Sequence, residues 1–405
     1  MGIFSSEREM QAWLSKQLKA SEGLNQLIAN IKEIEDLLSS DYVERRILDS
    51  YHECISALDL THIFSENENI SLKSGEILSP DFLLYSLEAQ RMVIVELKNL
   101  KGPSREAGTE LSAYSAELKS YIPFIAEGDI IHVIISSEWT TLLKHYAINE
   151  ILWGQKNLLC LQPINFKGSI KLQILSPSEL NQQGIPKKLS YKQIGGYQIC
   201  LYDPLAYSNS QTDFSPLIHQ MKTAIEAIAS YASARRSHGF AMLWKDVGNK
   251  LAPYSIAIMN VAPFQSIERF FHEEGFKPNE ITERFIKIIA EFYPMGHSAT
   301  LDAASRIGKE YLSPICSPRQ EGYFTWDLHL TEMKNRAMPI SFRGWGIFND
   351  LISNLVKEEY KKGNSEARYD DPKIGLTAID KLIDPNYQFI ELSNYFWSPE
   401  NGSIT

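Results

Sequence analysis

The chain has 405 residues, of which 44% are hydrophobic and 22% are charged, a composition typical of a globular protein and not of a disordered or fibrous one. Its net charge of -10 argues against a surface coated with Lys and Arg for gripping nucleic acid along its whole length. No stretch approaches the roughly 18 consecutive apolar residues that a membrane span requires, so we expect a cytoplasmic protein with no membrane partner.

The excess acid lies in the first half of the chain. Residues 1–180 hold 16 Lys and Arg against 25 Asp and Glu, whereas the remainder is nearly balanced. A broad basic surface would therefore have to come from the second half or from the assembly of several copies. The four cysteines are far apart and show none of the close pairs typical of zinc sites, so we interpret them as reduced, mostly buried thiols.

The first part of the chain predicts helices followed by a mixed sheet. Residues 7–38 and 40–60 repeat apolar residues at helical spacing. Short runs rich in Val, Ile, Leu and aromatics then predict strands. In chain order we expect strands at 70–75, 81–87 and 91–98, a helix at 104–122, a strand at 129–137, a helix at 140–154, and strands at 158–164 and 169–175. This order is typical of an α/β sheet flanked by helices.

A polar segment broken by Gly and Pro, Ser176–Ser190, predicts a linker. We therefore divide the chain into an N-terminal helical segment (1–39), an α/β domain (40–180) and an α+β and helical domain (181–405). In the last of these, strands are predicted at 196–204, 238–246 and 254–264, with a long helix at 215–236, and the pattern turns helical beyond about residue 264.

The hairpin formed by the two central strands carries three charged residues, Asp81, Glu96 and Lys98, at one end of an otherwise apolar sequence. With a two-residue loop near Ala89 and Gln90, Asp81 would lie opposite Lys98. Side chains two residues apart in a strand share a face, so Glu96 and Lys98 would stand side by side. We therefore expect all three charged groups to project from one face of the sheet.

Two carboxylates this close repel each other unless a cation joins them. A hard divalent metal with oxygen ligands suits that geometry, and we expect Mg²⁺, with Mn²⁺ as a substitute. Such an ion bridges to a substrate phosphate and lowers the pKa of a bound water. Lys98 would orient or deprotonate this water and offset the charge of the transition state. The cluster is therefore typical of phosphodiester hydrolysis.

These residues resemble a known signature. Pro80-Asp81, followed after a hairpin by Glu96-Leu97-Lys98, is similar to the PD-(D/E)xK motif of the restriction-endonuclease-like nuclease superfamily. The likeness covers about residues 40 to 140 and implies an αβββαβ core with a mixed sheet. It also implies that Asp81 and Glu96 are metal ligands, that the Leu97 carbonyl is a backbone ligand, and that Lys98 is the catalytic lysine.

The resemblance also suggests residues outside the hairpin. Many members carry an acid on the helix before the core, which makes Glu44 a candidate metal ligand, with Glu53 behind it. Some carry Gln or Glu four residues before a Tyr on the helix after the lysine, and Glu110 and Tyr114 have this spacing. For each of these residues the structural alternative is a solvated helix face. Candidate nucleic-acid contacts are Lys101, Glu110, Tyr114, Arg235 and Arg236, although the two arginines also suit the end of a helix.

The sequence thus predicts a Mg²⁺-dependent endonuclease that acts on DNA, joined to a C-terminal domain that senses, recruits or oligomerises. This layout resembles bacterial antiphage defence nucleases, which implies a homo-oligomer and a phage-derived or host activator. Two alternatives stay open. One is a nuclease-like fold kept as a non-catalytic binding or scaffolding module, and the other is a ribonuclease or structure-specific repair nuclease built from the same residues.

Overall fold

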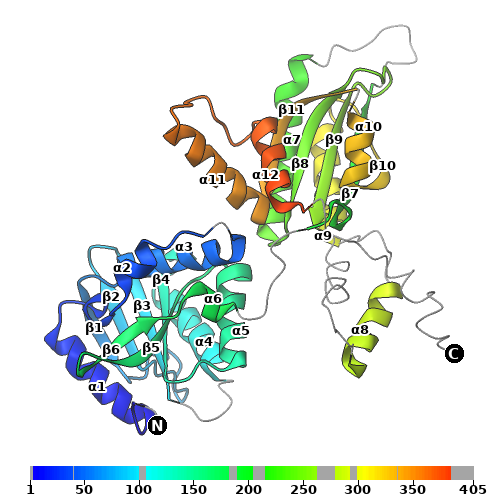
Figure 1. The fold of residues 1–405 in the computed structure, drawn as a ribbon. Coiled ribbons are helices and arrows are strands. Elements are labelled where there is room, and N and C mark those ends of the chain that lie inside the picture. The colour runs from blue at the N-terminus through cyan, green and yellow to red at the C-terminus, as the bar shows by residue number, and fades with distance from the viewer. Residues whose placement is uncertain are drawn as a thin grey trace. The chain divides into compact units, whose positions relative to one another are not determined.

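The computed structural model describes residues 3–39, 41–99, 106–181, 189–203, 215–261, 279–291, 299–334 and 336–384. The chain divides into two compact units, residues 1–187 and 188–405, which are described separately (Figure 1). In the described parts of both units, no helix is long and apolar enough to cross a membrane.

The first unit is a mixed α/β structure. Its elements are α1 (Glu7–Ala20), α2 (Ile31–Glu35), α3 (Tyr42–Ala57), β1 (Thr61–Glu66), β2 (Phe82–Ser86), β3 (Arg91–Lys98), α4 (Glu106–Tyr121), β4 (Ile130–Ser136), α5 (Thr141–Ile148), β5 (Asn157–Phe166), β6 (Ser169–Ile174) and α6 (Pro177–Leu180). The six strands lie side by side in chain order. β3, β4 and β5 are parallel to one another, and the remaining neighbours are antiparallel.

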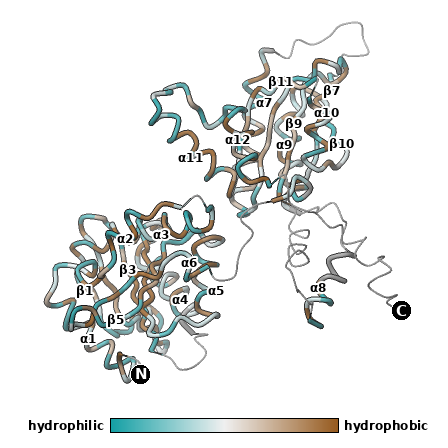
Figure 2. Tube along the Cα trace, viewed as in Figure 1, coloured by the Kyte–Doolittle hydropathy of each residue, from teal (hydrophilic) through white to brown (hydrophobic). Residues whose placement is uncertain are grey.

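One hydrophobic core holds this unit together, and helices cover both sides of its sheet (Figure 1). All seven residues of β4 are buried, as expected for a strand with neighbours on both edges and helices on both faces. Figure 2 shows the hydrophobic residues concentrated along these interior strands. Helix α1 buries Met10, Leu14 and Leu18 in the same core, so residues 1–39 belong to this unit.

The predicted strand at 70–75 is wrong. The structure places β1 at Thr61–Glu66, and residues 67–80 form a loop in which the Ile70 amide donates to the Leu78 carbonyl at 2.8 Å. β1 lies at the edge of the sheet, pairs only with β2 within the described sheet, and has an irregular register between Ile63 and Ser65. An edge strand with alternating exposure has no continuous apolar run, so its sequence does not show the pattern of a buried strand.

The second unit is built on an antiparallel sheet. Its described elements are β7 (Ile194–Tyr202), α7 (Ile218–Ala234), β8 (Gly239–Asp246), β9 (Tyr254–Val261), α8 (Glu280–Glu291), α9 (Ala299–Leu312), β10 (Ser317–Thr325), α10 (Trp326–Met333), β11 (Ala337–Trp345), α11 (Ile347–Lys361) and α12 (Pro372–Leu382). The strand order is β10-β7-β9-β8-β11.

A separate core lies on each face of this sheet. Ala241 and Leu243 of β8 point into the core formed with α7 and α9, whereas Phe240, Met242 and Trp244 point into the core formed with α10, α11 and α12. This alternation is the period of two expected of a strand covered on both faces. The sheet is therefore the middle layer of three.

The predicted helical pattern beyond residue 264 is incomplete, because β10 and β11 are strands among the helices. Both lie at edges of the sheet. Each contains a proline, Pro318 in β10 and Pro339 in β11, and such a residue is tolerated at an edge but argues against a strand in a sequence pattern. Tertiary pairing with β7 and β8, not local propensity, decides their conformation.

Candidate active site

The hairpin β2–β3 differs from its predicted register. The four-residue turn Leu87–Gln90 joins the strands, and Phe82 lies opposite Val95. The predicted two-residue loop is wrong, and so is the predicted pairing of Asp81 with Lys98. The last turn residue adopts the left-handed conformation (φ 52°), which no strand pattern reveals. The observed register differs from the predicted one by two residues. Side chains of a strand alternate between faces with a period of two, so this shift leaves the hairpin side chains on their predicted faces.

The charged side chains of the hairpin lie together at the end of β3. Asp81 immediately precedes β2, and its Oδ2 accepts a hydrogen bond from the Leu97 amide at 2.7 Å. Lys98 Nζ donates to Glu96 Oε1 at 2.6 Å. Glu96 and Lys98 are only 3% and 6% exposed, because β3 is an interior strand paired with β2 and β4.

Helix α4 adds two side chains to this cluster. Glu110 Oε2 accepts a second hydrogen bond from Lys98 Nζ at 2.9 Å. Tyr114, four residues later on the same helical face, donates its hydroxyl hydrogen to the Ser79 carbonyl at 3.1 Å. Ser79 stands two residues before Asp81, so Tyr114 fixes the direction from which the chain enters β2. Both residues predicted on α4 therefore contact the site or its support.

The charges at the site perturb one another. Burial raises the pKa of Asp81 to about 6 although the hydrogen bond from the Leu97 amide opposes the shift. Burial and the neighbouring Asp81 carboxylate raise the pKa of Glu96 to about 9. Burial alone would lower the pKa of Lys98. The carboxyl groups of Glu96 and Glu110 have a larger effect and raise the pKa of the amine. In the ion-free site Glu96 therefore retains a proton that an isolated carboxyl group would release at neutral pH, whereas Asp81 releases its proton near pH 6.

Glu110 shows the opposite behaviour. Its partial burial would raise its pKa, but the hydrogen bond from Lys98 prevails and lowers it. Glu110 is therefore the carboxylate that stays ionised beside the ammonium. Burial also raises the pKa of Tyr114, so this hydroxyl remains a neutral donor.

A hard divalent ion needs oxygen ligands. Asp81 and Glu96 offer carboxylate oxygens, and Glu96 Oε2 is a buried atom with no hydrogen-bond partner in the structure. Leu97 belongs to the same strand and has its amide already bonded to Asp81. Among the described residues, no group of three or more His, Cys, Asp or Glu side chains is arranged to hold a metal. An ion held by Asp81 and Glu96 alone would keep most of its water ligands, which is the usual requirement of Mg²⁺.

A carboxylate that the sequence reasoning missed comes from α1. Glu7 Oε2 accepts a hydrogen bond from the Asn99 amide at 3.3 Å, and the Asn99 side-chain amide donates to the Phe4 carbonyl at the same distance. The negative charge of Glu7 contributes to the raised pKa of Asp81, so the two carboxyl groups are electrostatic neighbours. In the sequence, Glu7 follows the capping residue Ser6 and looks like an ordinary first-turn acid.

The other predicted acids have different partners. Glu44, in the first turn of α3, accepts a hydrogen bond from Ser39 at 2.7 Å. Glu53 forms an ion pair with Arg91 at 2.7 Å. Arg91 is the first residue of β3, whereas Lys98 is the last, and eight residues of strand span about 23 Å. Glu53 is therefore at the far end of the strand from the cluster.

The remaining predicted nucleic-acid contacts are Lys101, Arg235 and Arg236. Lys101 lies outside the described residues. Arg235 and Arg236 follow α7 in the second unit, where the Arg235 guanidinium lies 5.3 Å from the centre of the Tyr231 ring. This placement at a helix end agrees with their structural interpretation.

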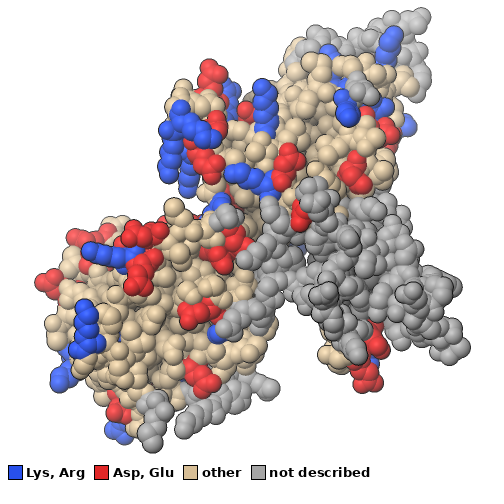
Figure 3. All heavy atoms as spheres, in the orientation of Figure 1, with Lys and Arg blue, Asp and Glu red and all other residues tan. Residues whose placement is uncertain are grey.

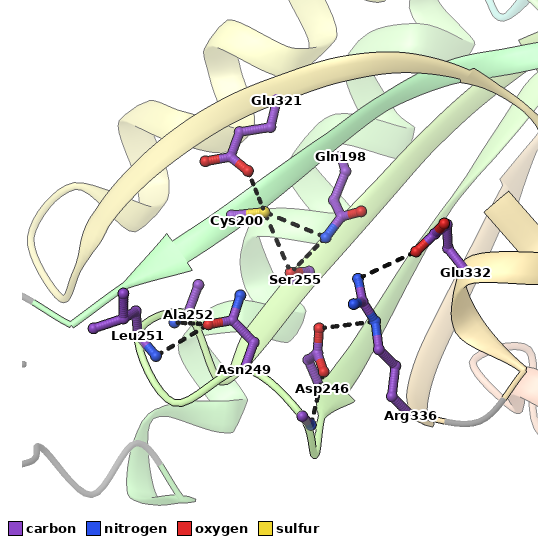
Figure 4. A network of polar contacts seen from close by, with 11 residues as sticks. Gln198, Cys200, Asp246, Asn249, Leu251, Ala252, Ser255, Glu321, Glu332 and Arg336 are labelled. Atoms are coloured by element: carbon purple, nitrogen blue, oxygen red, sulfur yellow. Dashed lines mark hydrogen bonds and ion pairs between the residues drawn. The ribbon is translucent and has the colours of Figure 1, made fainter.

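The second unit contains its own polar cluster around a cysteine. Figure 4 shows Cys200 between Gln198, Ser255 and Glu321; the amide of Gln198 donates to its sulfur at 3.3 Å, and the thiol faces Glu321 Oε2 at 3.4 Å. Burial raises the pKa of Cys200 to about 11, so the group is a neutral thiol at physiological pH. All four cysteines are free and buried. A neutral, hydrogen-bonded thiol supports packing and not nucleophilic chemistry.

Comparison with known proteins assigns no family to the chain. No family model matches it, and neither a curated protein nor a solved structure matches it. The cluster at the end of β3 is therefore the basis on which a function is inferred.

Proposed function

We propose that the first unit is a Mg²⁺-dependent nuclease that hydrolyses phosphodiester bonds of DNA. The observation that carries this proposal is the gathering of Asp81, Glu96 and Lys98 at one end of a buried hairpin. Burial of such charges is costly for stability, which favours a chemical use. The element order α3-β1-β2-β3-α4-β4 adds support, because it is the αβββαβ order that the sequence resemblance implies.

Each residue has a role in this proposal. Asp81 and Glu96 would hold the ion, with Mn²⁺ as a substitute for Mg²⁺. When bound, the ion supplies polarisation of the phosphoryl oxygen and a bound water of lowered pKa. Lys98 would orient the bound water or take its proton, and would offset the charge that develops in the transition state. Tyr114 positions the segment that carries Asp81.

The surface charge bears on how DNA would be held. On the face shown in Figure 3, acidic and basic side chains of the first unit are interspersed and no basic stripe appears. Residues 1–180 carry excess acid. We therefore propose that a metal ion and a second copy of the chain are needed for productive contact with a polyanion. A role in bacterial defence against phage or foreign DNA, with a phage-derived or host activator, rests on layout alone.

The proposal is tested with purified full-length protein, supercoiled plasmid and Mg²⁺ or Mn²⁺. We expect cleavage that EDTA abolishes and that Lys98→Met reduces by about 100-fold or more, the scale of a lost electrostatic stabiliser. Lys73→Met is the matched control, because Lys73 is an exposed lysine of the same unit paired with Glu76. Cleavage that survives EDTA or Lys98→Met would contradict the site.

The same assay separates the alternatives in substrate. Linear, nicked and single-stranded DNA and RNA of the same sequence are compared at equal concentration. A preference for RNA would identify a ribonuclease, and a preference for nicked or branched DNA a structure-specific repair nuclease. Either outcome would leave the proposed catalytic residues unchanged and would replace DNA as the proposed substrate.

A second candidate is a non-catalytic binding or scaffolding module. It is favoured by the ion pair between Lys98 and Glu96, together with the absence of a third metal-ligating side chain among the described residues. In that case the cluster is a closed buried ion-pair network. The expected result is then no cleavage of any substrate and no uptake of Mg²⁺ or Mn²⁺ in calorimetry.

A further inference from the structure

Lys98 occupies a specific place among the carboxyl groups of the site. Its ammonium lies 2.6 Å from Glu96 and 2.9 Å from Glu110, so it bridges an acid of β3 and an acid of α4. The side chains of Lys98 and Glu96 are buried, whereas that of Glu110 is about one-third exposed, at 34%. One cation thus serves two acceptors that differ in their freedom to move.

This arrangement conflicts with a divalent ion on the same acids. An ion held by Asp81 and Glu96 would place two positive charges beside the ammonium, and the repulsion would be strong because the surroundings are buried. The amine therefore has to withdraw from Glu96 when an ion binds. Glu110 is the acceptor to which it is already bonded on its other side.

We propose that Lys98 is the resident cation of the ion-free site, and that Glu110 is a positioning residue that takes over the ammonium when a divalent cation binds Asp81 and Glu96. This inference rests on the proposed metal site. It gives the ion-pair network a regulatory role, because the amine competes with the metal for Glu96 and Glu110 sets the strength of that competition.

The effects of substituting Lys98 and Glu110 on metal affinity should then depend on each other. Without Glu110, the ammonium has only Glu96 as a close partner, and the metal must displace it without an alternative acceptor. Without Lys98, no ammonium competes for Glu96, and the loss of Glu110 then removes only the charge of a neighbouring carboxylate. If Glu110 acted only through its negative charge, its loss would weaken metal binding to the same extent with and without Lys98.

The test is a double-mutant cycle on Mn²⁺ affinity, measured by calorimetry and by electron paramagnetic resonance of free Mn²⁺, with the full chain and no nucleic acid. We expect Glu110→Gln to weaken Mn²⁺ binding about tenfold in the native background and by less than about twofold in Lys98→Met, a coupling within the usual range for contacting residues. Lys98→Met alone should bind Mn²⁺ more tightly than the native protein.

Glu117→Gln is the matched control. Glu117 lies on the same helix, accepts a hydrogen bond from the Leu72 amide at 2.5 Å, and should leave Mn²⁺ affinity unchanged. If Glu110→Gln fails to fold, Glu110→Asp enters the cycle instead, with a smaller coupling of the same sign.

The outcomes separate this inference from the proposed function. Equal weakening by the Glu110 substitution in both backgrounds, with Mn²⁺ bound by the native protein, would overturn the inference and leave the metal site standing. No Mn²⁺ uptake by any of the four proteins would overturn both. If the Glu110 substitution weakens Mn²⁺ binding more in the native protein than in Lys98→Met, the result supports the transfer of the Lys98 ammonium to Glu110.

Discussion

Replacement of Asp81 by Asn should make the ion-free protein more stable at alkaline pH. The folded protein holds the pKa of Asp81 at about 6, mainly through burial, against an ordinary value of 3.8 for an aspartate in an unfolded chain. A carboxyl group whose pKa is raised by folding keeps its proton in the native state after the unfolded chain has released it. Ionisation therefore destabilises the native state, and the penalty is absent well below pH 3.8, grows up to pH 6, and is constant above.

The size of this effect follows from the shift. Two pKa units correspond to about 3 kcal/mol, of which about 0.5 kcal/mol is already present at pH 4. Asp81→Asn removes the ionisation but weakens the hydrogen bond from the Leu97 amide, which costs about 1 kcal/mol at any pH. The stability of the variant relative to the native protein should therefore rise by about 2 kcal/mol between pH 4 and pH 8.

Urea unfolding in EDTA at a series of pH values measures this difference, with hydrogen exchange of the β3 peptide reporting on the first unit. Asp49→Asn, at an exposed aspartate on α3, is the matched control for the loss of a carboxylate from the same unit. If the advantage of Asp81→Asn fails to grow with pH, or declines, then burial does not strain this carboxylate and the electrostatic account of the site is wrong.

Three further substitutions test the packing that supports the two units. Asn30→Ala should cost the first unit about 2 to 3 kcal/mol in chemical unfolding, because the buried amide of Asn30 exchanges two hydrogen bonds with the backbone of Ile174, at 2.8 and 3.0 Å. Gly375→Ala should destabilise the second unit by about 1 to 3 kcal/mol, since a Cβ there would come within 2.3 Å of the Phe342 ring; unchanged hydrogen exchange in α12 would contradict this. Tyr114→Phe should cost about 1 kcal/mol and speed proteolysis of the loop before β2.

The sequence predicted correctly those strands that are buried along most of their length and therefore contain a run of apolar residues. The strands β3 and β4 have apolar runs because both of their edges are paired, and the common face of Asp81, Glu96 and Lys98 follows from the two-residue period of a strand. The register of the hairpin did not follow, because it depends on the length of a turn that the strand pattern leaves open.

The strands and the site residue that the sequence did not predict depend on tertiary contacts. β1, β10 and β11 are edge strands whose conformation depends on a single neighbour, and their sequences carry polar residues, prolines or a bulge. Glu7 lies some 90 residues along the chain from Lys98 and reaches the site only because α1 packs against β3 and Asn99 bonds to both Glu7 and Phe4. No local pattern contains that information.

The tie between Asn99 and the start of α1 has a practical consequence for handling the protein. Asn99 follows Lys98 directly, and its two hydrogen bonds to Phe4 and Glu7 connect the beginning of the polypeptide to the strand that carries the amine. A change at Phe4 or Glu7 would therefore reach the strand that ends at Lys98 through these two hydrogen bonds. The first turn of α1 is thus a poor place for a substitution that is meant to be neutral.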